Sequence, residues 1–203
     1  VDMPGIVSSE DYKRINPVGE TPTLMLPDGR MLSESMAILG HIAAKTVSEG
    51  LGFEPGSPDD DRLKQMLAFL NTSFFNAFGP LWYTIEHELA DTAKAALRDY
   101  GIAKVERAHA DLEMLLDGKE WLIGDRRSMA DAYFMGIARW NDFHKVVDRR
   151  RFRALNSLYE RMLGDPAVRF AHAIEHEEPA PSAGGFLGHV SLDDVLGQMS
   201  KAA

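Results

Sequence analysis

The 203-residue sequence contains no cysteine. This absence excludes a disulfide scaffold, a thiolate metal site and a catalytic thiol among these residues. No apolar run approaches the roughly 20 residues that a membrane-spanning helix needs. The opening VDMPGIVSSEDYK also has neither the basic start nor the apolar stretch of a signal peptide. We therefore expect a cytoplasmic protein without a membrane partner.

Positive charge is also scarce. The sequence has 22 Lys and Arg residues and 31 Asp and Glu residues, which gives a net charge of -9. Such a chain repels phosphate backbones, so no nucleic acid partner is expected. The basic run Arg149-Arg150-Arg151 is interpreted as a solvated face. His172 and His176 have helical metal-ligand spacing, but a polar helix end explains them better, and no metal is predicted.

The first part of the chain has the pattern of a hairpin followed by a helix. TLMLPDGRMLS, residues 23–33, places two apolar runs around Asp28-Gly29, a strong hairpin signal. From Glu34 the apolar spacing becomes helical and ends near Val47. Glycine and proline then crowd residues 50–58, which indicates a linker and a domain boundary.

Beyond the linker the sequence shows only helical periods. Ser128 and Asp131 have capping-box spacing and mark one helix start. Gly79-Pro80 should interrupt or kink the first long helix. The apolar spacing predicts helices at about 63–85, 93–118, 128–140, 152–163 and 166–174, with one or two further turns at 191–196.

Five stretches occur in an order and spacing that are hard to obtain by coincidence: Asn16–Pro22, Asp28–Leu32, Ser33–Ile38, Trp121–Gly124 and Tyr159–Val168. Together they resemble the cytosolic glutathione transferases, particularly the bacterial, beta-like members. The resemblance implies an α+β fold, with a truncated thioredoxin-like N-terminal domain followed by an all-α C-terminal domain. The expected bounds are a partial glutathione-binding domain at 1–47, a linker at 48–58, the helical domain at 59–178 and a C-terminal extension at 179–203.

By the same resemblance, Val1 lies after the second strand of the thioredoxin-like domain. The family's strand-helix-strand before that point carries the Tyr, Ser or Cys that activates the glutathione sulfur. The activating, catalytic residue is therefore unknown and expected in that absent segment. Tyr12 and Tyr83 do not match the motif's position and are not assigned this role.

The resemblance implies that glutathione, the co-substrate, binds at Thr21, Pro22, Glu34 and Ser35. A cis Thr21-Pro22 bond would expose the main chain of Thr21 for pairing with an extended peptide. A helix start at Glu34-Ser35 suits a carboxylate, and Glu34 could accept from an ammonium group. Read without the family, Pro22 would be an ordinary trans-proline, and Ser33 or Ser35 a simple helix cap.

Aromatic residues concentrate between Phe74 and Tyr83, and most of them are expected in the core. Phe75, Phe78 and Trp82 are the residues that we assign to the pocket for the second substrate. Phe75 and Asn76 fall where beta-class relatives usually place a His-Lys pair. The departure makes the pocket wall more apolar and favours hydrophobic electrophiles.

The leading hypothesis is a glutathione transferase, a homodimer by resemblance, that joins the glutathione thiolate to a small hydrophobic electrophile. One alternative is a non-catalytic member of the fold that serves as a protein-interaction module. Another is an isomerase or reductase that uses glutathione as cofactor. Turnover without net consumption of glutathione would identify the isomerase.

Overall fold

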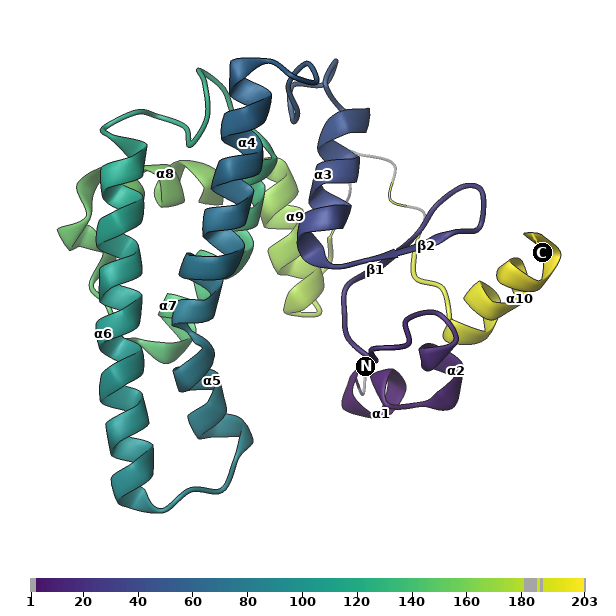
Figure 1. Cartoon of the computed structure of the whole chain (residues 1–203), viewed down its shortest axis with the longest axis horizontal. Helices are drawn as coiled ribbons and strands as arrows, with labels where there is room; N and C mark the ends of the chain where they lie inside the picture. The colour runs from purple at the N-terminus through teal and green to yellow at the C-terminus, as the bar shows by residue number, and fades with distance from the viewer. Residues whose placement is uncertain (1–2, 181–185, 187, 203) are drawn as a thin grey trace. The chain divides into compact units, whose positions relative to one another are not determined.

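The computed structural model describes residues 3–180, 186 and 188–202 (Figure 1). The chain divides into two compact units. The smaller is made of Val1–Ile42 together with Gly184–Ala203, and the larger of Ala43–Ala183.

The smaller unit is built around the predicted hairpin. Its elements are α1 (Met3–Val7), α2 (Glu10–Lys13), β1 (Thr23–Met25), β2 (Met31–Ser33), most of α3 (Ser35–Lys45) and α10 (Leu192–Ala202). The strands are antiparallel, and Leu24 lies opposite Leu32 at the centre of the register. Gly29 takes a φ of 84° in the turn, a left-handed conformation that suits glycine. The hairpin and the helix after it are confirmed.

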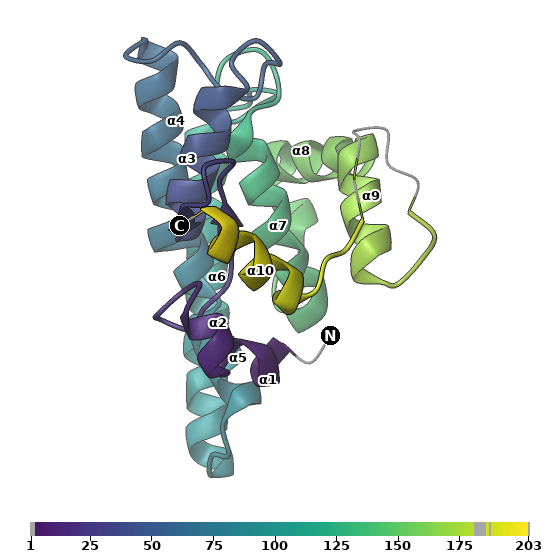
Figure 2. The ribbon, with the colours of Figure 1, turned by 90° about the vertical axis from the view of Figure 1, so that its right-hand side faces the viewer.

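Two parts of the smaller unit differ from the prediction. Helices α1 and α2 are short, and α2 begins after Ser9, whose side chain accepts a hydrogen bond from the Tyr12 backbone N–H at 3.1 Å. Helix α10 is longer than the one or two turns expected and contacts α2, as Figure 2 shows. The end of the chain therefore belongs to the same unit as the hairpin.

The larger unit contains helices joined by loops and no strand among its described residues, as predicted. Its helices are α4 (Pro58–Phe69), the π-helix η1 (Leu70–Phe75), α5 (Gly79–Glu86), α6 (Asp91–Leu116), α7 (Met129–His144), the 3-10 helix η2 (Arg149–Arg151), α8 (Arg153–Leu163) and α9 (Pro166–Glu175). Among these described residues no helix is long and apolar enough to cross a membrane. The same part of the chain has no cluster of three side chains that could hold a metal ion, around His172 and His176 or elsewhere.

The first long helix is interrupted earlier than the sequence suggested. A break was predicted at Gly79-Pro80, where α5 does begin. The regular helix, however, already ends at Phe69 and widens into η1. The following helix then packs closely on α6, since a Cβ atom on Gly101 would lie 2.7 Å from Cδ2 of Leu81. Gly101 thus permits the close approach of α5 and α6.

The predicted capping box at the start of α7 is confirmed. The Asp131 carboxylate accepts from the Ser128 backbone N–H at 2.7 Å and from the Ser128 hydroxyl at 2.9 Å. It also accepts from the Leu122 N–H at 3.0 Å. Burial raises the pKa of Asp131 above its ordinary value, and the hydrogen bonds oppose that rise. The carboxylate therefore ties the preceding loop to the helix, which runs on past the predicted end to His144.

The expectation for the basic run holds for Arg150 and Arg151 but is wrong for Arg149, which is only 8% exposed. Its guanidinium donates to the Ala138 carbonyl and to the Asp142 carboxylate, both at 3.0 Å. A buried arginine is tolerated because these partners compensate its charge. Arg149 is thus part of the larger unit's interior.

Candidate functional site

The strand register brings together the two segments predicted to bind glutathione. Thr23 in β1 lies opposite Ser33 in β2. In an antiparallel pair the residues just before one strand and just after the other meet at the same end. Thr21-Pro22 and Glu34-Ser35 therefore lie beside each other at one end of the hairpin. The Thr21-Pro22 bond is cis, as the family resemblance implied.

The loop before β1 is fixed by hydrogen bonds that leave Thr21 available. The Tyr12 hydroxyl donates to the Glu20 carbonyl at 2.9 Å, and the Asn16 amide donates to the same oxygen at 2.7 Å. Among the described residues, the peptide N–H and C=O of Thr21 have no hydrogen-bond partner. Thr21 and Pro22 are both exposed. This short edge can therefore accept a bond from, and donate a bond to, the main chain of an extended ligand.

The other half of the site is the start of α3. Glu34 precedes the helix with a φ of 71°, and its carbonyl accepts from the Ile38 N–H at 3.0 Å. Within the described part of the chain, no hydrogen bond reaches the N–H groups of Ser35, Met36 and Ala37. Free N–H groups at a helix start attract an anion, and the helix dipole adds to the attraction. The exposed Glu34 carboxylate beside them suits a cation.

The predicted pocket residues in the larger unit converge on Trp140 of α7. The Trp140 ring centroid lies 4.9 Å from that of Phe75, 5.7 Å from that of Phe78 and 5.4 Å from that of Trp82. Their exposure differs, since Phe75 is 38% exposed, Trp82 is half-buried and Phe78 is 0% exposed. Phe78 therefore supports the cluster from the core, and Phe75 and Trp82 have surface that a ligand can touch.

Sequence reasoning missed Trp140 and His144, which belong to this aromatic cluster. The rings of Trp82 and His144 lie 4.6 Å apart between centroids. Trp82 Nε1 and His144 Nε2 are buried, and neither finds a hydrogen-bond partner in the described residues. Burial, followed by the charge of Arg98, lowers the pKa of His144. The aromatic cluster thus encloses two polar atoms, the indole N–H of Trp82 and Nε2 of His144, that have no hydrogen-bond partner among the described residues.

Tyr12 and Tyr83, which were not assigned the thiol-activating role, make other contacts. The Tyr12 hydroxyl, besides its bond to Glu20, lies 3.1 Å from Oγ1 of Thr23. Tyr83 is exposed and stacks on His87 at 3.9 Å between ring centroids. Tyr12 therefore has a structural role in positioning the loop.

The chain matches family models in both of its parts. Residues 1–45 match the glutathione S-transferase N-terminal domain, and residues 62–166 match the glutathione S-transferase C-terminal domain. Glutathione S-transferase GST-4.5 of Xanthomonas campestris pv. campestris is 31% identical over 166 residues, covering 81% of this chain and 80% of that protein. GstA of Escherichia coli O157:H7 is 27% identical over 168 residues, covering 83% of this chain and 80% of that protein.

Solved structures of glutathione S-transferases have a similar fold. A sphingomonad glutathione S-transferase complexed with glutathione is 30% identical, with a TM-score of 0.70, and the match covers 84% of this chain and 80% of that one. A ternary complex of BphK, a bacterial GST, is 28% identical with a TM-score of 0.73, covering 87% and 85%. The predicted thioredoxin-like N-terminal part and helical C-terminal domain are thus confirmed. The chain belongs to the glutathione S-transferase family.

Proposed function

We propose that this protein is a glutathione transferase that holds glutathione at Thr21, Pro22, Glu34 and Ser35. The observation that carries the proposal is the pairing of Thr23 with Ser33, since it places the free Thr21 edge beside the α3 start. The similar sphingomonad transferase is complexed with glutathione, which supports the same ligand here.

Each part of glutathione has a chemically matched group at this site. The cysteinyl main chain pairs with the N–H and C=O of Thr21, as an added strand would. The α-carboxylate of the γ-glutamyl part takes the free N–H groups at the α3 start and the Ser35 hydroxyl. Its ammonium group pairs with the Glu34 carboxylate. These residues bind and orient the peptide, and none of them is assigned to thiol activation.

The reaction follows from the chemistry of the thiolate. Once the thiol has lost its proton, the sulfur lone pair attacks an electrophilic carbon and forms a carbon–sulfur bond. The displaced electron pair leaves with a leaving group or moves into the electrophile's conjugated system. We assign small hydrophobic electrophiles as the second substrate, because Phe75, Trp82 and Trp140 offer mainly apolar surface.

The binding site is tested by retention on immobilised glutathione. Replacing both Glu34 and Ser35 with alanine should abolish retention, because the ammonium and carboxylate contacts are lost together. The matched control is Ser48→Ala with Glu49→Ala, which removes an exposed hydroxyl and an exposed carboxylate elsewhere on the chain. Equal retention of the two double variants, with unchanged circular dichroism, would refute the assignment.

Catalysis is tested separately, with the longest natural reading frame that contains this chain and a panel of aromatic and unsaturated electrophiles. Formation of the glutathione thioether, measured by mass spectrometry, is the expected result. Retention on glutathione without any conjugate across the panel would instead indicate a binding module of the same fold.

A further inference from the structure

Helix α10 begins at a position that its own side chains specify. The Asp194 backbone N–H donates to the Ser191 hydroxyl oxygen at 3.1 Å. The Asp194 carboxylate accepts in return from the Ser191 hydroxyl at 2.7 Å and from the Ser191 N–H at 3.1 Å. This reciprocal pair is a capping box, and the bonds from Ser191 hold the pKa of Asp194 below its ordinary value. The helix therefore has a defined start.

One face of α10 is apolar and covered. Leu192, Val195, Leu196 and Met199 follow one another at intervals of one, three or four residues and share this face. Leu196 is 9% exposed and the other three are half-buried, whereas Gln198 lies outside this face and is exposed. Helix α10 contacts α2 and belongs to the same compact unit (Figure 2). Its apolar face is therefore docked onto the smaller unit.

Helix α2 depends on such a contact because it is very short. It has only four residues, and an isolated helix of one turn is not stable in water. Its cap supplies one hydrogen bond, from the Tyr12 N–H to the Ser9 hydroxyl oxygen at 3.1 Å. Tyr12, at 8% exposed, is the buried residue of α2. The packing of α10 therefore helps to hold α2, and Tyr12 with it, in place.

Tyr12 and Asn16 hold the chain on both sides of Thr21. The Tyr12 carbonyl accepts from the Asn16 backbone N–H at 2.9 Å, which fixes Asn16 relative to α2. The side chains of Tyr12 and Asn16 both donate to the Glu20 carbonyl, just before Thr21. They also lie 3.1 and 3.3 Å from Oγ1 of Thr23, just after it. The position of the Thr21 edge is thus set from α2.

We infer that α10 is a positioning element of the proposed glutathione site. Its docking on α2 keeps Tyr12 and Asn16 where they hold Thr21 in the ligand-binding position. The inference rests on the proposed function, and in it α10 acts through α2 without touching the ligand. The coupling is reciprocal: docked α10 raises the affinity for glutathione, and bound glutathione favours docked α10 by the same factor.

Single residues can weaken or strengthen the docking of α10. Gly197 lies within the helix, where glycine is less favourable than alanine. A Cβ atom on Gly197 would meet nothing within 4 Å, so Gly197→Ala should strengthen the helix without a new contact. Leu196→Asp instead places a charge on the apolar face and should undock it. Gln198→Asp adds the same charge at an exposed position and is the matched control.

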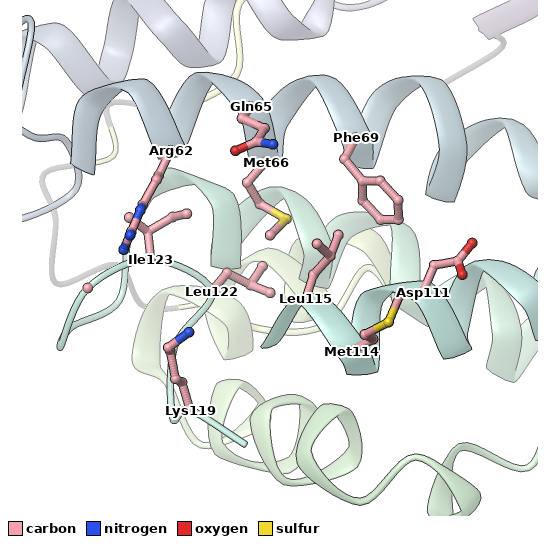
Figure 3. Close-up of a pocket in the computed structure, with 11 residues that line it drawn as sticks. Arg62, Gln65, Met66, Phe69, Asp111, Met114, Leu115, Lys119, Leu122 and Ile123 are labelled. Carbon is pink, nitrogen blue, oxygen red and sulfur yellow. The ribbon is translucent and has the colours of Figure 1, made fainter. Parts of the chain in front are cut away.

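Isothermal titration with glutathione, on the longest natural reading frame that contains this chain, measures the effect on binding. Leu196→Asp should weaken binding about tenfold or more, and Gln198→Asp should bind like the unaltered protein. Ile123→Ala controls for a general loss of stability, because Ile123 is 4% exposed and lines a pocket between α4 and α6 of the larger unit (Figure 3). It should lower the urea midpoint of unfolding and leave the glutathione affinity unchanged.

A double-mutant cycle tests the route through Tyr12. Tyr12→Phe keeps the ring and removes the hydroxyl that holds the Glu20 carbonyl, so it should also weaken glutathione binding. Because α10 acts through that hydroxyl, Tyr12→Phe combined with Leu196→Asp should bind no more weakly than Leu196→Asp alone. Independent, multiplied losses of affinity would overturn the inference.

Hydrogen exchange supplies a readout that simple structural support would not move. Glutathione should slow exchange of the α10 amides several-fold in the unaltered protein, but not in the double variant Glu34→Ala with Ser35→Ala. Gly197→Ala should slow exchange in α2 as well as in α10 without ligand. Equal affinity of Leu196→Asp and Gln198→Asp, or α10 exchange that bound glutathione leaves unchanged, would refute this inference alone. An unaltered protein that binds no glutathione would refute the proposed function as well.

Discussion

The guanidinium carbon of Arg149 lies 3.6 Å from the centre of the Tyr159 ring. The Tyr159 hydroxyl in turn donates to the Asp142 carboxylate at 2.5 Å, and the same carboxylate accepts from Arg149 at 3.0 Å. Burial is the main cause that raises the pKa of Tyr159, followed by its bond to Asp142. Three side chains from η2, α7 and α8 thus form one closed set of contacts, which links these elements in the larger unit.

Replacing Arg149 with alanine should lower the free energy of unfolding by about 2–3 kcal/mol, because Tyr159 loses its stacking partner and Asp142 its cation. Urea unfolding followed by circular dichroism measures this change. The control is Arg150→Ala, since Arg150 is exposed and water screens its ion pair with Asp148 at 2.8 Å, so that its loss should change stability little. Equal midpoints for the two variants would contradict the structural role of Arg149.

His109 should make the protein sensitive to acid. Its ring is fully buried, Nδ1 lies 2.8 Å from the Val105 carbonyl, and Nε2 has no partner among the described residues. Burial lowers the pKa of His109 from 6.5 to about 4. The unfolded chain therefore takes up the proton first, and stability falls as the pH drops from 6.5 toward 4. The loss should total about 3 kcal/mol.

The variant His109→Leu tests this assignment, with urea midpoints measured at several pH values from 8 to 4. It should flatten the decline, leaving the smaller contribution of His144, whose pKa is lowered in the same direction. Leu112→Ala, a buried position on the same helix, should lower stability equally at all pH values. A decline in His109→Leu as steep as in the unaltered chain would rule out this histidine as its cause.

Glu34 combines an unfavourable backbone with a proposed binding role, and the two can be separated. A φ of 71° is costly for glutamate and alanine but not for glycine. Glu34→Gly should therefore raise the free energy of unfolding by about 1 kcal/mol, and Glu34→Ala should leave it nearly unchanged. Both should weaken glutathione binding equally, as measured by calorimetry, because both lack the carboxylate. Full affinity in Glu34→Gly would show that the carboxylate is not used.

Truncation of Phe78 should mainly affect stability, and truncation of Phe75 should mainly affect ligand preference. Phe78→Ala should lower the free energy of unfolding by about 3–5 kcal/mol, because Phe78 has no exposed surface. Phe75→Ala should cost less than about 2 kcal/mol but reduce the preference for S-hexylglutathione over glutathione several-fold. Tyr100→Ala, an exposed aromatic on α6, serves as the control. An unchanged preference in Phe75→Ala would remove Phe75 from the pocket.

The parts of the fold that local chemistry determines were predictable from the sequence. Asp28-Gly29 specifies its turn within a few residues, and Ser128 with Asp131 specifies a helix start. The burial of Arg149 was not predictable in this way. It depends on Ala138, Asp142 and Tyr159, which come from other elements. The run of three arginines, taken by itself, predicts an exposed face.

The candidate site likewise contains residues that the sequence could indicate and residues that only tertiary packing brings together. The residues that we propose to bind glutathione could be named because the family resemblance covers both segments, and the hairpin register accounts for their proximity. Trp140 joins Phe75, Phe78 and Trp82 only through the packing of α7, so no spacing in the sequence indicates it. The empty hydrogen-bonding positions of Trp82 and His144 are likewise visible only in three dimensions.

The wide turn of η1 makes the length of the chain matter at this place. Each residue of an α-helix advances the chain by about 100° around the axis. The wide turn of η1 holds about one residue more than a regular α-helical turn, so losing a single residue between Leu70 and Phe75 would regularise it and leave Phe78 and Leu81 facing the interior. Losing a residue from the regular helix of α4 would instead rotate everything after it by about 100° and turn both side chains out of the interior.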